Sequence, residues 1–281
     1  MDTKRLLEKE NSFRTETKLI ENLKLKQSNF SRENCLKKHS ITSCMRAKMI
    51  DWLLEVAVAY DCQPSVVFLS ITYMDRFFKN FYTKLKAKKL HMTGMVALFL
   101  ASKYQSVFPL PIKALVEKIA HNKYLPVEFL NFERVFLKVL NFKLNTPTVF
   151  TFLDIFSTQF LVPKCVHQTA LVVSLISEFF YENLDLLPSS VATAALIIAA
   201  TSTNQFALAT LIVSSVKVPP SNEVIEKVRS KVYSFPQNYP NLKHLEQAYE
   251  VSFALKKPGP LFRFVNKSLR TEQNHLLKNP F

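Results

Sequence analysis

Carboxylates spaced by one helical turn are the first residues of this sequence that could do chemistry. Asp51 and Glu55 stand four positions apart, so on a helix the two side chains would be neighbours and could act as an acid and base pair. No nucleophile or pocket motif accompanies them in the sequence, and a solvated helix face is the simpler interpretation. We therefore do not expect an enzyme.

Metal and cofactor chemistry is also unsupported. The cysteines form no C-x-x-C pair, and the histidines form no H-E-x-x-H or other ligand spacing on one helix face. The only glycines are Gly94 and Gly259, too few for a phosphate-binding loop or a dinucleotide-binding fingerprint. We expect no metal, no cofactor, and reduced intracellular thiols instead of disulfides.

The chain is strongly basic, with a formal net charge of +15 at pH 7. The charge is spread over the first forty residues, the lysines between 79 and 89, and the end of the chain. A solvated basic surface explains this distribution, and so does attraction to an acidic partner or to nucleic acid. Charged residues at the start and polar residues at 201–205 lead us to expect neither a signal peptide nor a membrane span.

Apolar residues recur at helical spacing along most of the chain, which predicts an all-α fold. Thr42 and Ser43 mark the start of one helix. Prolines just inside a helix predict further starts at Pro126 and Pro147, and Pro147 is the expected domain boundary. The apolar face of the first helix is formed by Met45, Met49, Trp52, Val56, Ala59 and Tyr60.

A weak internal repeat relates residues 90–103 to residues 188–201 without gaps. Both segments are apolar on nearly all sides, as expected of a central helix surrounded by others. The copies differ at their ends, where Lys103 stands opposite Thr201. The repeat predicts two similar helical bundles, although two alanine-rich helices can also align by chance.

Several motifs together resemble the cyclin family, and most closely its A and B (mitotic) types, over residues 16–250. The resemblance implies two tandem five-helix cyclin boxes and an extra N-terminal helix within about residues 15–27. It divides the chain into an N-terminal arm and helix (1–38), a first, kinase-binding box (39–145), a second box (146–250) and a basic tail (251–281). The motifs are Met45–Val56, Asp75-Arg76-Phe77, Leu100–Tyr104, Phe132–Phe142, Thr146-Pro147-Thr148 and Leu187-Pro188-Ser189.

The resemblance implies a regulatory subunit that binds and activates a cyclin-dependent protein kinase in cell-cycle control, in the nucleus and cytoplasm. Lys103 and Glu133 match positions that contact the kinase segment ahead of and within its regulatory helix. An internal ion pair between these two, or two exposed side chains, is the alternative. Leu137, Phe142 and Leu144 match apolar interface positions, with ordinary core packing as the alternative.

Arg46 and Asp75 match a structural ion pair of the family, and we expect them to hold the scaffold together. A second set matches the shallow patch with which A- and B-type cyclins bind Arg-x-Leu motifs of kinase substrates and inhibitors: Met45, Met49, Trp52, Glu55 and Leu90. Three other positions depart from that pattern, namely Lys48, Ala87 and His91. A lysine in the patch would repel an incoming arginine, so this docking is in doubt.

Lys9-Glu10-Asn11 spells the short degradation signal read by the ubiquitin ligase of anaphase. Three residues also occur by chance. The main alternative function is a nucleic-acid-binding transcription factor with duplicated cyclin-like folds. It draws on the charge of +15, but such factors usually carry a zinc ribbon that these cysteines cannot form, and we expect no specific nucleic acid partner.

Overall fold

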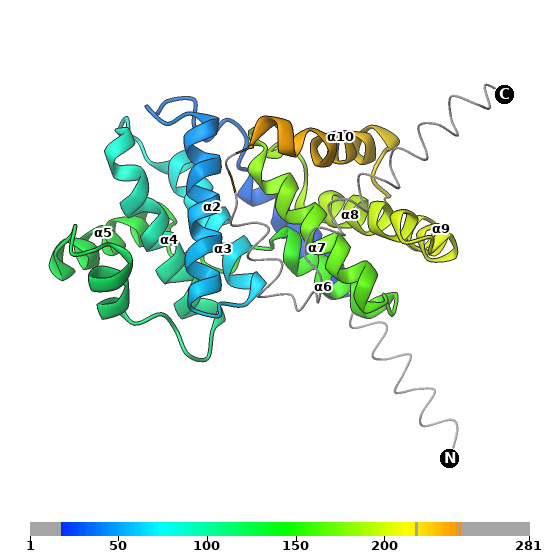
Figure 1. The fold of residues 1–281 in the computed structure, drawn as a ribbon, viewed down its shortest axis with the longest axis horizontal. Coiled ribbons are helices and arrows are strands. Elements are labelled where there is room, and N and C mark those ends of the chain that lie inside the picture. The colour runs from blue at the N-terminus through cyan, green and yellow to red at the C-terminus, as the bar shows by residue number, and fades with distance from the viewer. Residues whose placement is uncertain (1–17, 217–218, 241, 243–281) are drawn as a thin grey trace, which may run out of the picture.

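A computed structural model describes residues 18–216, 219–240 and 242, and over these residues the regular structure is helical, without strands. The helices form two groups that lie side by side, α2 to α5 in one and α6 to α10 in the other (Figure 1). The predicted all-α class with two successive helical bundles is confirmed.

The first group follows an N-terminal helix, α-helical over residues 18–27, that ends in a 3-10 turn. The side chain of Thr42 accepts a hydrogen bond from the backbone N–H of Met45, so α2 begins where the sequence predicted. Pro126 is the first residue of α5, again as predicted. The elements are α2 (Ser43–Ala59), α3 (Pro64–Asn80), α4 (Leu90–Gln105), the π-helical segment η3 (Ala114–Ile119) and α5 (Pro126–Val139).

The second group begins slightly later than predicted. Pro147 lies before the helix and not inside it, because Thr148 caps the first turn by accepting a hydrogen bond from the N–H of Thr151. Pro188 is the first residue of its helix. The helices are α6 (Val149–Gln159), α7 (Lys164–Phe179), α8 (Pro188–Ser202), α9 (Phe206–Ser215) and α10 (Asn222–Asn238).

The repeated segments form the central helices of the two groups. Helix α4 packs against α2, α3 and α5, and α8 packs against α6, α7, α9 and α10. Twelve of the sixteen residues of α4 and twelve of the fifteen residues of α8 are buried. The apolar stretch of residues 191–213 is divided between α8 and α9 by a turn at Asn204, which has φ 59°. Within the described residues, no helix has the length and apolarity of a membrane span.

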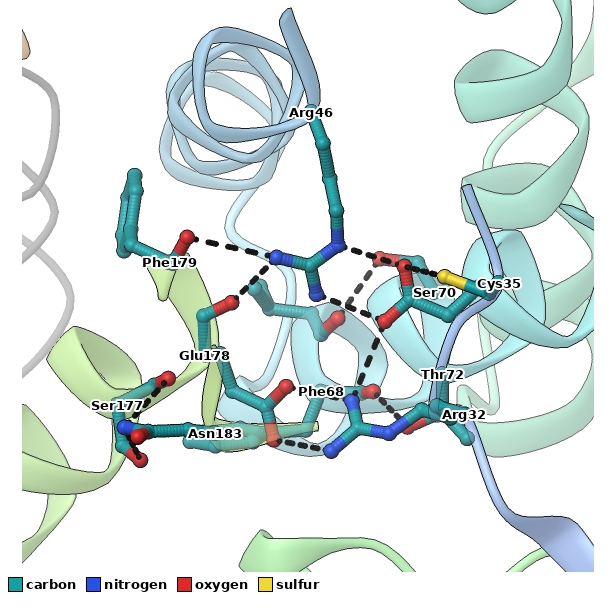
Figure 2. A network of polar contacts seen from close by, with 12 residues as sticks. Arg32, Cys35, Arg46, Phe68, Ser70, Thr72, Ser177, Glu178, Phe179 and Asn183 are labelled. Carbon is teal, nitrogen blue, oxygen red and sulfur yellow. Dashed lines mark hydrogen bonds and ion pairs between the residues drawn. The ribbon is translucent and has the colours of Figure 1, made fainter. Parts of the chain in front are cut away.

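A buried polar network joins the two groups (Figure 2). Arg46 of α2 donates from Nε and Nη2 to the two carboxylate oxygens of Asp75 in α3, each at 2.7 Å, and both side chains are fully buried. Arg46 also donates from Nη1 to the carbonyl oxygen of Glu178 at the end of α7, at 2.7 Å. Arg32 lies between Asp75, at 3.4 Å, and the carboxylate of Glu178, at 2.5 Å.

The predicted pair of Arg46 and Asp75 is thus present, within a larger network than the sequence indicated. Charge-assisted hydrogen bonds in fixed geometry connect the segment before α2 to both helical groups. The thiol of Cys35 lies 4.0 Å from Asp75, and burial, followed by the Asp75 charge, raises the pKa of that thiol. The positions of the domain boundaries at 39, 146 and 251 remain predictions.

Candidate functional site

Lys103 and Glu133 lie together on the first helical group. Lys103 is in the last turn of α4, and its Nζ donates a hydrogen bond to Oε1 of Glu133 in α5. The same Nζ is 4.3 Å from the centroid of the Phe99 ring. The Lys103 side chain is 41% exposed and that of Glu133 only 9%. The internal ion pair that the sequence left as an alternative is therefore formed, and a kinase contact at these residues remains a prediction.

Exposed apolar residues continue directly from Lys103 along the chain. Tyr104 is partly exposed, and Val107 and Phe108 are 88% and 91% exposed. Contiguous exposed apolar surface marks interaction sites, whereas apolar side chains exposed singly are common. We included Tyr104 in a family motif but did not single out Val107 or Phe108 from the sequence. The sequence feature that could have indicated them is the position of Val107 and Phe108 directly before Pro109, just after an apolar helix.

The turn after α5 presents the other predicted contact residues. Phe142 is 65% exposed, whereas Leu137 and Leu144 are half-buried. Asn141 and Phe142 have φ values of 52° and 56°, in the left-handed region. A phenylalanine there is strained, and such strain persists only where the surroundings hold it. Of the predicted apolar contacts, Phe142 alone projects mainly into solvent, and the others also pack against the core.

Two residues of α3 hold this turn in place. The Tyr73 hydroxyl donates to the carbonyl oxygen of Leu144 at 2.7 Å, and Arg76 Nη1 donates to the carbonyl oxygen of Lys143 at 2.9 Å. Burial, more than the nearby Tyr104 hydroxyl, raises the pKa of Tyr73, so its hydroxyl stays protonated and able to donate. We had not assigned Tyr73 or Arg76 a role from the sequence, because their partners lie about seventy positions away.

Four of the five predicted docking-patch residues line one shallow hollow of about 290 Å³, together with the three positions that depart from the family pattern. The fifth, Glu55, is exposed but does not line it. His91 lies edge-on to Trp52, with ring centroids 4.6 Å apart. Burial, and then the charge of Lys123, lowers the pKa of His91. The lining consists of Met45, Lys48, Met49, Trp52, Ala87, Leu90 and His91.

The two carboxylates one helical turn apart on α2 differ in exposure. Asp51 is buried and Glu55 is exposed, so the predicted solvated face is right for Glu55 and wrong for Asp51, because α2 packs against α3, α4 and α7. Among the described residues, no cluster of histidine, cysteine, aspartate or glutamate could hold a metal ion. Lys9, Glu10 and Asn11 lie outside the described residues.

Comparison with known proteins assigns most of this surface to one domain type. Residues 18–145 match the family model described as "Cyclin, N-terminal domain". G2/mitotic-specific cyclin-A of Drosophila melanogaster is 31% identical over 160 residues, which are 57% of this chain and 32% of the relative. Cyclin-A2 of Xenopus laevis is 32% identical over 170 residues, 60% of this chain and 40% of the relative. The matched part thus spans about a third of the length of these curated relatives.

Solved structures agree with the fold. A viral cyclin from Herpesvirus saimiri matches with a TM-score of 0.63 at 16% identity, over 81% of this chain and 99% of the viral chain. A chain of the CAK complex from Chaetomium thermophilum, bound to ATP-gamma-S, matches with a TM-score of 0.50 at 16% identity, over 90% of each chain. At this identity the likeness shows the fold alone.

Proposed function

Because this chain belongs to the cyclin family, we propose that it is a regulatory subunit that binds and activates a cyclin-dependent protein kinase in cell-cycle control. The proposal rests on one observation above others. The Lys103–Glu133 pair and the exposed side chains of Val107, Phe108 and Phe142 all belong to residues 18–145, the region that matches the cyclin N-terminal domain.

The mechanism we propose is conformational. A protein kinase holds its phosphates correctly only when a lysine on one of its strands pairs with a glutamate on its regulatory helix. A cyclin that binds the aligned state better shifts the kinase toward that state. Phe142 and Leu144 would pack against the regulatory helix, and the strained turn would meet it already ordered. Preorganisation of this kind reduces the entropy lost on binding.

The Lys103–Glu133 pair would orient the kinase at this contact through hydrogen bonds. The Lys103 ammonium has donors left after its bond to Glu133, and its exposed side can reach backbone carbonyl oxygens of the kinase. The second helical group contributes packing support through Glu178, whose carboxylate accepts a hydrogen bond from Arg32 and whose carbonyl oxygen accepts one from Arg46. Kinase contact is therefore assigned mainly to the first group.

Phosphorylation of histone by a purified cyclin-dependent kinase tests the proposal. We expect no phosphorylation by this chain alone, and activity when both proteins are present. The double variant Lys103→Ala/Glu133→Ala should lower the activation at least tenfold, because contacts at a well-packed interface centre dominate binding. The matched control is Lys113→Ala/Glu117→Ala, which removes an exposed lysine just before η3 and an exposed glutamate within it.

A second variant separates interface from folding. Phe142→Ala removes a largely exposed ring, so the stability should change little while kinase affinity falls by about a factor of ten or more. Full activation by both the double variant and Phe142→Ala would place the kinase contact elsewhere.

Three further roles belong to the same proposal. The hollow beside Trp52 could dock kinase substrates or inhibitors, although Lys48 in its lining opposes an arginine. Lys9-Glu10-Asn11 would be read by the ubiquitin ligase of anaphase, and the protein would act in the nucleus and cytoplasm. The DNA-binding alternative is not favoured by relatives named as cyclins. Sequence-selective duplex binding that survives about 150 mM salt would revive it.

A further inference from the structure

A basic hollow of about 770 Å³ lies beside the turn that presents Phe142 and Leu144. Three segments that are distant in the sequence form it: the end of the N-terminal helix (residues 26–31), the end of α3 (76–80) and the turn after α5 (140–145). Its charged lining residues are all cationic, namely Lys26, Arg76, Lys79 and Lys143, and the lining contains no aspartate or glutamate.

Arg76 is the buried member of this set. It is only 4% exposed, and its guanidinium lies 4.4 Å from the centroid of the Phe30 ring. Its hydrogen bonds go to neutral acceptors, the carbonyl oxygen of Lys143 and the hydroxyl of Thr146. Burial lowers the pKa of Arg76 to about 10, the nearby Tyr73 opposing it in part. Within the part of the chain that the structure describes, no carboxylate pairs with this guanidinium, which is unusual because buried charges are normally paired.

The lysines around Arg76 are also without acidic partners among the described residues. Lys79 Nζ donates to the hydroxyl of Ser31 at 3.0 Å, and Lys38 Nζ donates to the carbonyl oxygen of Lys79 at 3.0 Å, which brings a further cation close. The side chains of Lys26 and Lys143 are exposed. Cations gathered around one concave surface repel one another and concentrate the field that attracts an anion.

We infer that this hollow receives a carboxylate-bearing segment of the partner kinase. The inference rests on the proposed function and extends it, since it names the chemistry of the kinase surface beside Phe142. Charge complementarity requires an anionic occupant. Phe142 and Leu144 line the same hollow, so an occupant that covers their apolar atoms while presenting carboxylates to the lysines is a protein segment.

Such a contact would select among kinases and speed their association. Cationic and acidic surfaces that match across an interface raise the association rate and reject partners of the wrong sign. A kinase with a basic segment at this position would meet the positive charges of Lys26, Lys79 and Lys143, and would bind more weakly.

The test compares two charge-removing variants of the full chain in binding to the cyclin-dependent kinase that the wild-type chain captures. Lys26→Gln/Lys143→Gln removes two side chains that make no hydrogen bond or ion pair within the described residues. Lys113→Gln/Lys118→Gln removes the same charge from exposed positions in and beside η3. We expect the hollow variant to bind about tenfold more weakly in low salt, with a smaller salt dependence, and the control to stay within about twofold.

Hydrogen exchange of the kinase in the two complexes identifies the docked segment. The segment protected by the wild-type chain but not by Lys26→Gln/Lys143→Gln should contain aspartate or glutamate. Equal kinase affinity for the wild type and both variants overturns the inference, even if inorganic phosphate binds the hollow. A protected kinase segment without aspartate or glutamate overturns it as well. Failure of the wild-type chain to bind any cyclin-dependent kinase would instead reject the proposed function.

Discussion

Lys103 of α4 and Glu133 of α5 are hydrogen-bonded to each other in the unbound chain. The lysine is half-exposed, while the glutamate is nearly buried. A kinase that uses these groups must therefore share or replace an existing ion pair. The pair keeps the Glu133 carboxylate compensated, because an unpaired buried charge would destabilise α5.

Removing only the lysine should destabilise the chain more than neutralising both partners. We expect Lys103→Met to lower the free energy of unfolding by about 1 to 2 kcal/mol, because Glu133 loses its cation while the exposure of Lys103 screens part of the effect. Lys103→Met/Glu133→Gln should recover most of this loss. Urea unfolding monitored by circular dichroism measures both values.

The matched control for these variants is Lys113→Met, which replaces an exposed lysine outside the pair. Its free energy of unfolding should differ from that of the wild type by no more than about 0.5 kcal/mol. Strictly additive effects of Lys103→Met and Glu133→Gln would show that the two side chains are not coupled in solution.

Asp75 should be among the most sensitive positions for stability. Its carboxylate accepts hydrogen bonds from both Arg46 and Arg32 in a fully buried setting. Asp75→Ala leaves the Arg46 guanidinium uncompensated, and we expect a loss of about 3 to 5 kcal/mol. Arg46→Met/Asp75→Leu should lose less than Asp75→Ala alone, because it removes both charges and leaves the Arg32–Glu178 pair in place.

Thermal unfolding and urea titration of both variants check this order, with Asp154→Ala, at an exposed position of α6, as the control. If the double variant proves less stable than Asp75→Ala, the attraction between Arg46 and Asp75 exceeds the free energy lost in removing both charges from water.

Local rules predicted the helices well. Thr42 as a cap and Pro126 as a first residue depend on neighbouring residues alone. The two central helices followed from apolar residues on all sides of each segment. Pro147 was placed wrongly because the hydroxyl of Thr148 competes for the same position at the helix start.

Long-range contacts of the candidate site could not be predicted in this way. Arg32 and Glu178 are 146 positions apart, and Tyr73 is 71 positions from the Leu144 carbonyl that it holds. Helical periodicity relates residues three or four positions apart and gives no information about pairs so distant in the sequence. The left-handed turn at Asn141 and Phe142 was also missed, because phenylalanine is a poor residue for that conformation and only the surrounding hydrogen bonds maintain it.

Gly94 makes room for Met49 beside the hollow near Trp52. A Cβ added at Gly94 would lie 2.2 Å from Met49 Cε and 3.0 Å from its Sδ. Gly94→Ala should displace the end of Met49 into the hollow and lower stability by about 1 kcal/mol, since the clash exceeds the gain in helix propensity. In a Met49→Leu background, which lacks Cε, the same substitution should be neutral or stabilising. Thermal unfolding of the four proteins measures this coupling, and an unchanged Met49 methyl signal in Gly94→Ala would contradict the displacement.

Mildly acidic pH should lower the free energy of unfolding, because two histidines become protonated. Burial lowers the pKa of His91 and of His167 below the ordinary value of 6.5, with Lys123 adding to the effect at His91 and Asp154 opposing it at His167. A histidine with a lowered pKa binds its proton more tightly in the unfolded chain. Its stabilising contribution is therefore complete above about pH 6.5 and is lost as the pH falls through the folded-state pKa.

His91→Gln tests this dependence directly. Glutamine can still hydrogen-bond the Tyr124 hydroxyl that lies 3.4 Å from His91 Nδ1, but it does not titrate. The free energy of unfolding of His91→Gln should therefore fall less between pH 7.5 and pH 5.5 than that of the wild type, by a few tenths to about 1 kcal/mol. His121→Gln, at an exposed position, is the control for the loss of one histidine. An equally steep decline in His91→Gln would assign the acid sensitivity to His167 or to the carboxylates, because His91 would then contribute no difference in proton binding between the folded and unfolded chain.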